Sequence, residues 1–158
     1  MLAARHDWLL FSDADLSTPI EELKKFEREL GGHQIVIASR AVRGARIVTH
    51  QPSYREYAGK LFNLFVQTIA VPGVHDTQCG FKLFSREAGR RLFAKQTFEG
   101  FSFDVEVLYL ARKYGYSIAE IPVAWRNAEG TKVRFLRHGS AMIRDLFLIR
   151  LNDLRRKY

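Results

Sequence analysis

The sequence has 158 residues, of which 47% are apolar, and 25 lysines and arginines against 17 aspartates and glutamates give a net charge of +8. This length predicts a single domain with a substantial core, and the apolar content excludes a disordered tail. The single cysteine excludes an internal disulfide and a C-x-x-C metal site, and no apolar run is long enough to span a membrane.

The charge is unevenly distributed along the chain. Residues 1–111 contain 14 basic and 13 acidic side chains, whereas residues 112–158 contain 11 basic and 4 acidic ones. The excess therefore belongs to the last third of the chain, where nucleic acid, anionic lipid and phosphorylated substrates are the candidate partners. The first residues lack the basic-then-apolar order of a signal peptide, so we expect a reducing compartment.

The first forty residues predict a strand, a helix and a second strand. The apolar run 8–11 is too short for a helix and predicts a buried strand. Thr18 is placed to cap a helix, with Pro19 at its first position and Glu21 completing a capping box, and Gly31-Gly32 ends it. Residues 35–38 form the second strand, and this unit predicts a parallel sheet with a right-handed crossover.

The sequence predicts four further helices, at about residues 53–70, 86–93, 103–114 and 140–157, the last two from their apolar spacing. Ser85 is placed to cap the second of them, and Gly115 is placed to end the third. Residues 118–123 predict a strand, in which Pro122 favours a sheet edge. One βαβ unit is too few for a parallel sheet covered on both faces, so we expect part of a larger domain.

Two carboxylates follow the first strand directly, in Asp13-Ala14-Asp15. Ligands of open α/β sheets bind outside the carboxyl ends of the strands, and paired carboxylates there suit Mg²⁺ and the phosphates it binds. The alternative is a polar turn in which Asp15 faces the positive end of the following helix.

The block 76–84 is a second polar cluster. Gly80 within it indicates a close approach of backbone, and Cys79 could act as a nucleophile if His75 were its partner. We favour the simpler interpretation that Cys79 is a small buried apolar residue.

Further candidates are isolated charges. Asp104 and Glu106 stand at the start of a helix, where acidic residues are favourable without any catalytic role. Arg40, Arg55 and Lys132 stand in or beside loops near the active end of the sheet, and they could bind phosphate or simply be solvated. The five histidines lack ligand spacing, so a zinc site is not expected.

Together these motifs occur in one order that resembles the family 2 glycosyltransferases, most closely the dolichyl-phosphate β-glucosyltransferase branch. The segments that carry the resemblance are 13–19, 39–40, 76–84, 103–106, 120–125 and the Glu129–Lys132 loop. The polyprenyl-phosphate mannose synthase branch shares the order but usually lacks the block 76–84. The resemblance implies an α/β, Rossmann-like GT-A fold with a mostly parallel sheet flanked by helices.

The resemblance also implies a division of the chain. Residues 1–138 would be a partial catalytic domain without the nucleotide-binding half, and residues 139–158 a basic amphipathic helix. The Pro-x-Tyr-Asn-Glu-like loop that holds the nucleotide in such enzymes has no counterpart in this sequence. We therefore expect a fragment whose own activity is in question.

The resemblance implies a role for each candidate. Asp13 and Asp15 would bind Mg²⁺ or Mn²⁺, and Arg40, Arg55 and Lys132 would bind the phosphate of a lipid acceptor. Asp76, Gly80 and Glu106 would line the substrate site, with Asp104 as the candidate general base and Asp76 beside it as a second catalytic carboxylate.

The implied reaction is inverting hexosyl transfer, with glucose favoured, from UDP-glucose or GDP-mannose to a polyprenyl phosphate. The basic helix at 140–157 would lie on an anionic membrane at its cytoplasmic face. The alternatives are a mannose synthase-type transferase and a non-catalytic basic module that binds membrane or nucleic acid. We expect no nucleic acid partner, because no zinc finger or helix-turn-helix signature is present.

Overall fold

The computed structural model describes residues 1–127 and 135–158, with the side chains of 135–138 excepted. Its main sheet has four strands in the order β1 (Trp8–Ser12), β4 (Phe81–Ser85), β2 (Ile35–Ser39) and β5 (Ile118–Pro122). A small second sheet pairs β3 (Arg46–Thr49) with β6 (Ala124–Arg126) in parallel. β5 occupies an edge of the main sheet, as Pro122 predicted.

The strand order differs from the simple parallel sheet that we predicted. β1 and β2 run in the same direction, but β4 lies between them and pairs antiparallel with both. Only β2 and β5 are parallel neighbours in this sheet, with Ile35 opposite Ile118. The sheet is therefore mixed, because the chain returns through β4 between the two strands that a local βαβ pattern would place side by side.

The first helix is also less regular than its sequence signals indicated. It consists of α1 (Leu23–Phe26) between two 3₁₀ turns, at Ile20–Glu22 and Glu27–Glu29. The predicted Thr18 cap is wrong, since Pro19 occupies the N-cap position and no side chain bonds there. The Thr18 hydroxyl is instead buried, 3.7 Å from the Cys79 sulfur.

The other helices lie close to their predicted positions. They are α2 (Ser53–Ile69), α3 (Arg86–Lys95), α4 (Phe103–Lys113) and α5 (Phe135–Leu154). Ser85 caps α3 by accepting a hydrogen bond from the amide of Ala88, and Gly115 follows α4 with φ of 77°, as predicted. No helix among the described residues is both long and apolar enough to cross a membrane.

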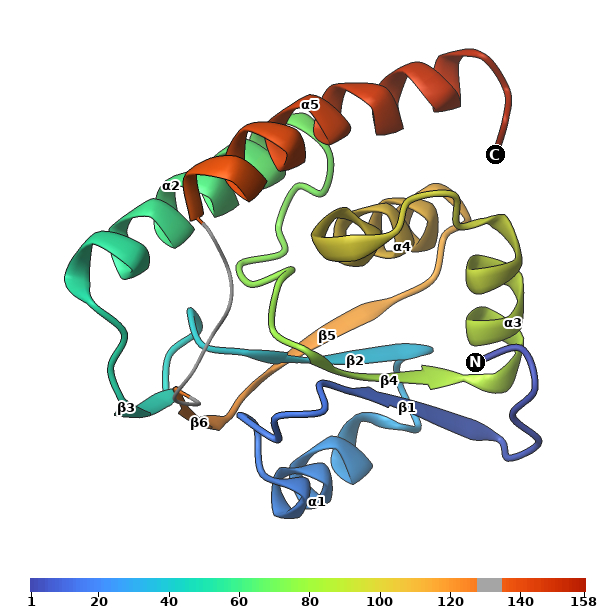
Figure 1. Cartoon of the computed structure of the whole chain (residues 1–158). Coiled ribbons are helices and arrows are strands. Elements are labelled where there is room, and N and C mark those ends of the chain that lie inside the picture. Colours follow the sequence, from blue (N-terminus) through green and yellow to red (C-terminus); the bar gives the residue numbers. More distant parts are fainter. Residues whose placement is uncertain (128–134) are drawn as a thin grey trace.

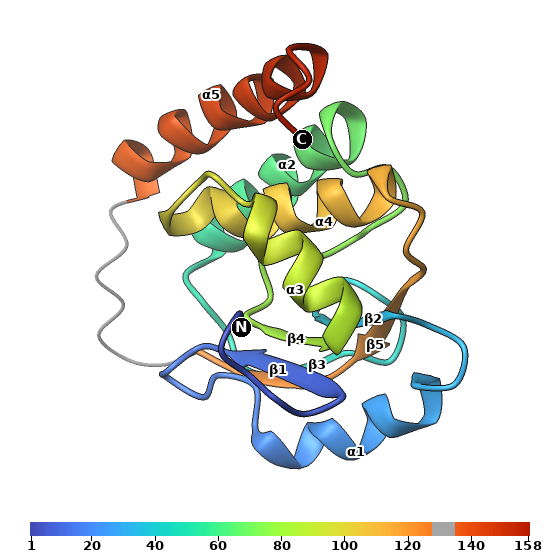
Figure 2. The same cartoon turned by 90° about the vertical axis from the view of Figure 1, so that its right-hand side faces the viewer.

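The elements form layers around the main sheet (Figure 1). α1 covers one face, α3 and α4 cover the other, and α2 and α5 form an outer pair beyond α4 (Figures 1 and 2). β2 is buried on both faces: Ile35 and Ile37 contribute to the larger core under the helices, while Val36 and Ala38 pack on the α1 side. This arrangement places the carboxyl ends of β1, β2 and β5 at the same end of the sheet.

Candidate active site

Several of the predicted site residues converge at that end of the sheet. Asp13 follows β1 and Arg40 follows β2, while Gly80 precedes the antiparallel β4 and so lies at the same end. The amide of Asp13 donates to the carbonyl of Gly80 at 2.8 Å, which joins the first motif to the block 76–84. Segments far apart in sequence thus meet where α/β sheets bind ligands.

Arg40 and Asp76 form an ion pair in which the carboxylate is buried and the guanidinium is partly exposed. The guanidinium donates two hydrogen bonds to the carboxylate, Nε to Oδ2 at 2.7 Å and Nη2 to Oδ1 at 2.9 Å, and the Arg40 amide adds a third at 2.9 Å. Burial opposes ionisation of Asp76, but Arg40 outweighs it and holds the pKa of Asp76 below its ordinary value. The guanidinium also lies 5.1 Å from the centre of the Trp125 ring. Arg40 is thus fixed in one orientation.

A second ion pair, more deeply buried than the first, joins β4 to α4. Its cation is Lys82, a residue to which our sequence analysis assigned no role. Lys82 is 1% exposed, and its Nζ donates to Asp104 Oδ1 at 2.5 Å and to the carbonyl of Cys79 at 2.7 Å. Burial raises the pKa of Asp104, and Lys82 opposes that rise. The sequence contained one indication of this role: Lys82 stands between apolar residues, and a lysine is costly to bury unless it is paired.

Asp13 and Asp15 form the exposed, acidic part of the site. Partial burial raises the pKa of Asp13, and the negative charges of Asp104 and Asp15 raise it further. A Cβ at position 80 would lie 1.8 Å from Asp13 Oδ2, so only glycine leaves room for this carboxylate. The prediction of a close backbone approach at Gly80 is confirmed.

This acidic pair fits a hard divalent cation in its chemistry. Repulsion between neighbouring carboxylates is what a bound cation relieves, and oxygen ligands are those that Mg²⁺ prefers. No set of three or more histidines, cysteines or acids within residues 1–127 and 135–158 is grouped to hold a metal. The protein would therefore supply two carboxylates, and phosphate oxygens and water would complete the coordination.

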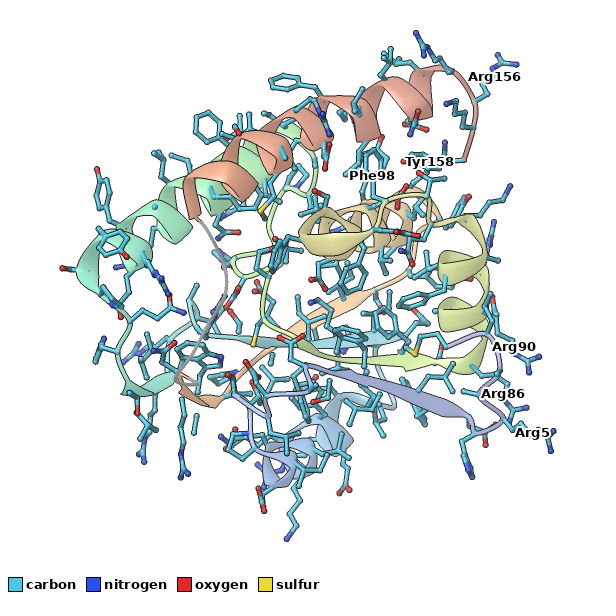
Figure 3. All side chains as sticks on the ribbon, in the orientation of Figure 1. Arg5, Arg86, Arg90, Phe98, Arg156 and Tyr158 are labelled. Atoms are coloured by element: carbon cyan, nitrogen blue, oxygen red, sulfur yellow. The ribbon has the colours of Figure 1, made fainter. Side chains whose placement is uncertain are left out.

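Glu106 lies apart from these residues. Its carboxylate is fully buried and accepts four hydrogen bonds, from the amides of Thr97 and Phe98 and the hydroxyls of Thr97 and Tyr158. Figure 3 shows Phe98 and Tyr158 close together above α4. All acceptor positions of the carboxylate are used, so Glu106 in this structure supports the loop before α4 rather than lining the site.

A cavity of about 850 Å³ lies between α2 and α5, beside the Arg40–Asp76 pair. Arg40, Arg55 and Asp76 all line it, and Arg55 reaches it from the first turn of α2. Much of the remaining lining is apolar or aromatic, with Phe62, Phe65, Phe101, Trp125, Met142 and Ile143 among it. Lys132, the third predicted phosphate ligand, lies outside the described residues.

Cys79 is not a nucleophile in this arrangement. Burial raises the pKa of its thiol to about 11, and the thiol is 1% exposed. The His75 ring is paired instead with Glu120, with 2.7 Å between Nδ1 and Oε2. The interpretation of Cys79 as a small buried residue is confirmed.

Comparison with solved structures identifies the class of fold. The chain resembles glucosyl-3-phosphoglycerate synthase from Mycobacterium tuberculosis, solved in complex with uridine diphosphate, with a TM-score of 0.55 and 18% sequence identity. The likeness covers 93% of this chain and 49% of that one. The predicted GT-A glycosyltransferase fold is confirmed.

Comparison with curated proteins shows which sequences this chain resembles. Dolichyl-phosphate β-glucosyltransferases are 36% identical in Dictyostelium discoideum and 35% in Homo sapiens over 98% of this chain, and 36% in Drosophila melanogaster over 94%. The chain spans about half the length of these relatives. No family model matches the sequence. The predicted resemblance to the dolichyl-phosphate β-glucosyltransferases is therefore confirmed.

Proposed function

We propose that this chain belongs to the catalytic machinery of an inverting glycosyltransferase that moves glucose from a nucleotide sugar to a polyprenyl or dolichyl phosphate. One observation carries the proposal: Arg40, which lines a cavity with largely apolar walls together with Arg55, also acts electrostatically on Asp13, a member of the acidic pair suited to a diphosphate-bound cation. The acidic pair matches the diphosphate of the nucleotide sugar, and the cavity matches the phosphate and the apolar chain of the lipid acceptor. The similarity to dolichyl-phosphate β-glucosyltransferases supports the same assignment.

The acceptor would enter the cavity between α2 and α5. Arg55 and the fixed Arg40 line this cavity together with aromatic and aliphatic side chains, so a phosphate head and the first apolar units of its chain find matching surfaces. Arg40 binds Asp76 through Nε and one N–H of Nη2, which leaves both N–H groups of Nη1 and the second one of Nη2 as donors for a phosphate. Lys132 remains our third proposed phosphate ligand.

The reaction needs positioning more than proton removal. An oxygen of the acceptor phosphate bonds to the anomeric carbon while the bond to the leaving diphosphate breaks, and its electron pair departs with the diphosphate. A phosphate monoester has a second pKa near 6, so the nucleophile is already largely ionised at neutral pH. Asp104 is our candidate base for the remaining protonated fraction, with Asp76 as the carboxylate that holds Arg40 in place.

Asp13 and Asp15 would hold Mg²⁺ or Mn²⁺. When bound there, the ion supplies charge neutralisation to the leaving diphosphate. The carboxylates themselves would orient the nucleotide sugar at the end of the sheet where Gly80 leaves room for Asp13. The enzyme would work as a peripheral protein at the cytoplasmic face of a membrane, where its lipid acceptor is found.

The proposal is tested by sugar transfer. The chain is assayed alone, and also in a chimera where it replaces the segment it matches in the Dictyostelium relative, with UDP-[¹⁴C]glucose and dolichyl phosphate. We expect transfer by the chimera, with a loss of at least about a hundredfold in Asp15→Asn and in Arg40→Gln. The matched control is Glu27→Gln, an exposed acid on the α1 side of the sheet.

The donor is tested separately by isothermal titration of UDP-glucose and of GDP-mannose in the presence of Mn²⁺. Tighter binding of UDP-glucose supports the glucosyl assignment, and preference for GDP-mannose replaces it with a mannose synthase-type reaction. A folded chimera that transfers neither sugar, or an Asp15→Asn variant as active as its parent, would overturn the enzymatic proposal.

A further inference from the structure

Glu120 is a largely buried carboxylate to which the proposed chemistry assigns no role. It stands in β5, opposite Ile37 of the neighbouring strand β2, and its side chain is only 10% exposed. It is not among the residues that line the cavity. A carboxylate that is so little exposed has to be paired or hydrogen-bonded, so the partners of Glu120 indicate what it does.

These partners all lie in the two-residue segment His75-Asp76, in the loop that runs from α2 down to β4 (Figure 1). Glu120 Oε2 accepts a hydrogen bond from the His75 amide at 2.8 Å and lies 2.7 Å from His75 Nδ1, and Oε1 accepts from the Asp76 amide at 3.0 Å. The carbonyl of His75 accepts a further hydrogen bond from Asn63 of α2. The backbone from the amide of His75 to that of Asp76 is therefore held entirely by side chains.

Asp76 connects this segment to Arg40. Its amide is bonded to β5 through Glu120, while its carboxylate accepts three hydrogen bonds from Arg40, at the end of β2. Asp76 thus bridges two neighbouring strands of the sheet. Because three bonds tie Arg40 to Asp76, the guanidinium takes its position from the loop that Glu120 holds.

We propose that Glu120 is a positioning residue for the anion-binding part of the cavity. It fixes the backbone at Asp76, and Asp76 in turn fixes Arg40 at the cavity wall. An arginine that is already ordered loses less conformational entropy when it binds a phosphate. The inference rests on the proposed function in one respect, since Arg40 is taken there as a phosphate ligand.

The variant Glu120→Gln tests this role with little change of shape. Glu120 has two acceptor oxygens for the donors of the loop, whereas a glutamine has one oxygen and an NH₂ group that cannot accept. At least one donor of the His75-Asp76 segment would therefore lose its partner. The matched control is Glu29→Gln, which alters another acid paired with a histidine, His33 at 3.4 Å, outside the cavity lining.

Isothermal titration of geranyl phosphate into the full chain measures anion binding without any sugar transfer. We expect Glu120→Gln to bind about five- to tenfold more weakly than the wild type, and Glu29→Gln to bind equally well. In an Arg40→Gln background, Glu120→Gln should cause no further loss, because its effect passes through Arg40. Additive losses in the double variant would overturn the proposal.

The ring of His75 is tested separately with His75→Ala. This variant keeps both amide bonds to Glu120, so it should change the affinity by no more than about twofold. A loss as large as that of Glu120→Gln would assign the effect to the ring and overturn the route through Asp76. Circular dichroism verifies that all variants are folded.

Nuclear magnetic resonance tests the positioning of Arg40 when no phosphate is present. The Nε–H of Arg40 donates to Asp76 Oδ2 at 2.7 Å, and its signal is identified by its absence in Arg40→Gln. Its proton should exchange with water at least about fivefold faster in Glu120→Gln than in the wild type or in Glu29→Gln. Unchanged exchange would overturn the proposal.

The two measurements separate this inference from the proposed function. If the wild-type chain binds no geranyl phosphate but the Arg40 signal responds to Glu120→Gln as expected, only the assignment of the cavity to a phosphate-bearing acceptor is overturned. If binding weakens in Arg40→Gln but not in Glu120→Gln, the anion site stands and the role of Glu120 is overturned.

Discussion

Lys82 is a single residue on which much of the candidate site depends. It places a positive charge in the interior, where an ionised group is costly unless it is paired. Its ammonium is bonded to Asp104, and its charge also acts on Asp13 and Asp76. The acidic groups of the site are therefore tolerated close together because two cations, Lys82 and Arg40, lie among them.

Replacing Lys82 with methionine should destabilise the protein by about 3–5 kcal/mol, because Asp104 would remain buried without its partner. Urea denaturation followed by circular dichroism measures this loss. In a double variant Lys82→Met/Asp104→Asn, part of the stability should return, since the uncompensated charge is removed.

The matched control is Lys25→Met, which removes an exposed lysine paired with Glu22. Its cost should not exceed about 1 kcal/mol. If Lys82→Met cost no more than this control, the buried pair would have no special part in holding the site together.

The sequence predicted which residues meet at the site better than it predicted how they pair. These residues do come together. Asp13 follows β1, Arg40 follows β2, Asp76 stands in the loop before β4, and Asp104 stands in the first turn of α4. The role of Lys82 was missed because a lysine in a short strand usually faces water. Lys82 is buried because α4 covers that face of β4. This contact joins segments that are distant in sequence.

At the scale of elements, α5 serves two surfaces at once. Its inner side contributes Leu146 and Ile149, both 1% exposed or less, to the larger core. Asp145 accepts a hydrogen bond from Ser102 at 2.7 Å, and Asp153 is bonded to Tyr109 and Lys113. The helix is thus fixed to α4 and to the turn before it, while its outer side remains apolar and exposed.

Two substitutions in α5 separate these surfaces. Ile149→Ala should cost about 2–5 kcal/mol of unfolding free energy, because it leaves a cavity in the core. Leu154→Ala, at a side chain 80% exposed, should change it by no more than about 0.5 kcal/mol. Thermal and urea unfolding measure both values, and equal effects would show that α5 does not belong to the folded core.

The elements that the sequence predicted are those with a strong local pattern. Apolar spacing predicts α4 and α5, the Ser85 cap predicts α3, and an unbroken apolar run predicts β2. The strand β4 (Phe81–Ser85) was missed, because Lys82 interrupts its apolar run and the segment continues directly from the polar residues 76–80. The pairing of β3 with β6 was missed because it joins residues such as Arg46 and Ala124, which are 78 positions apart in sequence.

At the scale of the whole molecule, the single thiol reports on unfolding. Cys79 packs in the smaller core between the sheet and α1, and burial raises the pKa of its thiol to about 11. At pH 8 its thiolate fraction is about two hundredfold below that of an ordinary cysteine with pKa 8.5. Labelling with a disulfide reagent should therefore follow opening of the fold.

We expect the native chain to react at least about a hundredfold more slowly than the urea-unfolded chain. The rate in the native state should rise with pH only up to the ordinary thiol pKa of about 8.5, because the thiolate of the transiently opened chain is the form that reacts. Ile20→Cys, with its exposed side chain, provides the fast reference. Equally fast labelling of both cysteines would mean that the layer between the sheet and α1 is open.

The contact between Gly80 and Asp13 has a consequence for how this protein can evolve. A side chain at position 80 and the carboxylate at position 13 cannot occupy the same space. Selection for an acidic group at 13 therefore also removes mutations at 80, although glycine offers no functional group of its own. Homologous sequences should change the two positions together or not at all, and a lineage that abandons the acid becomes free to replace the glycine.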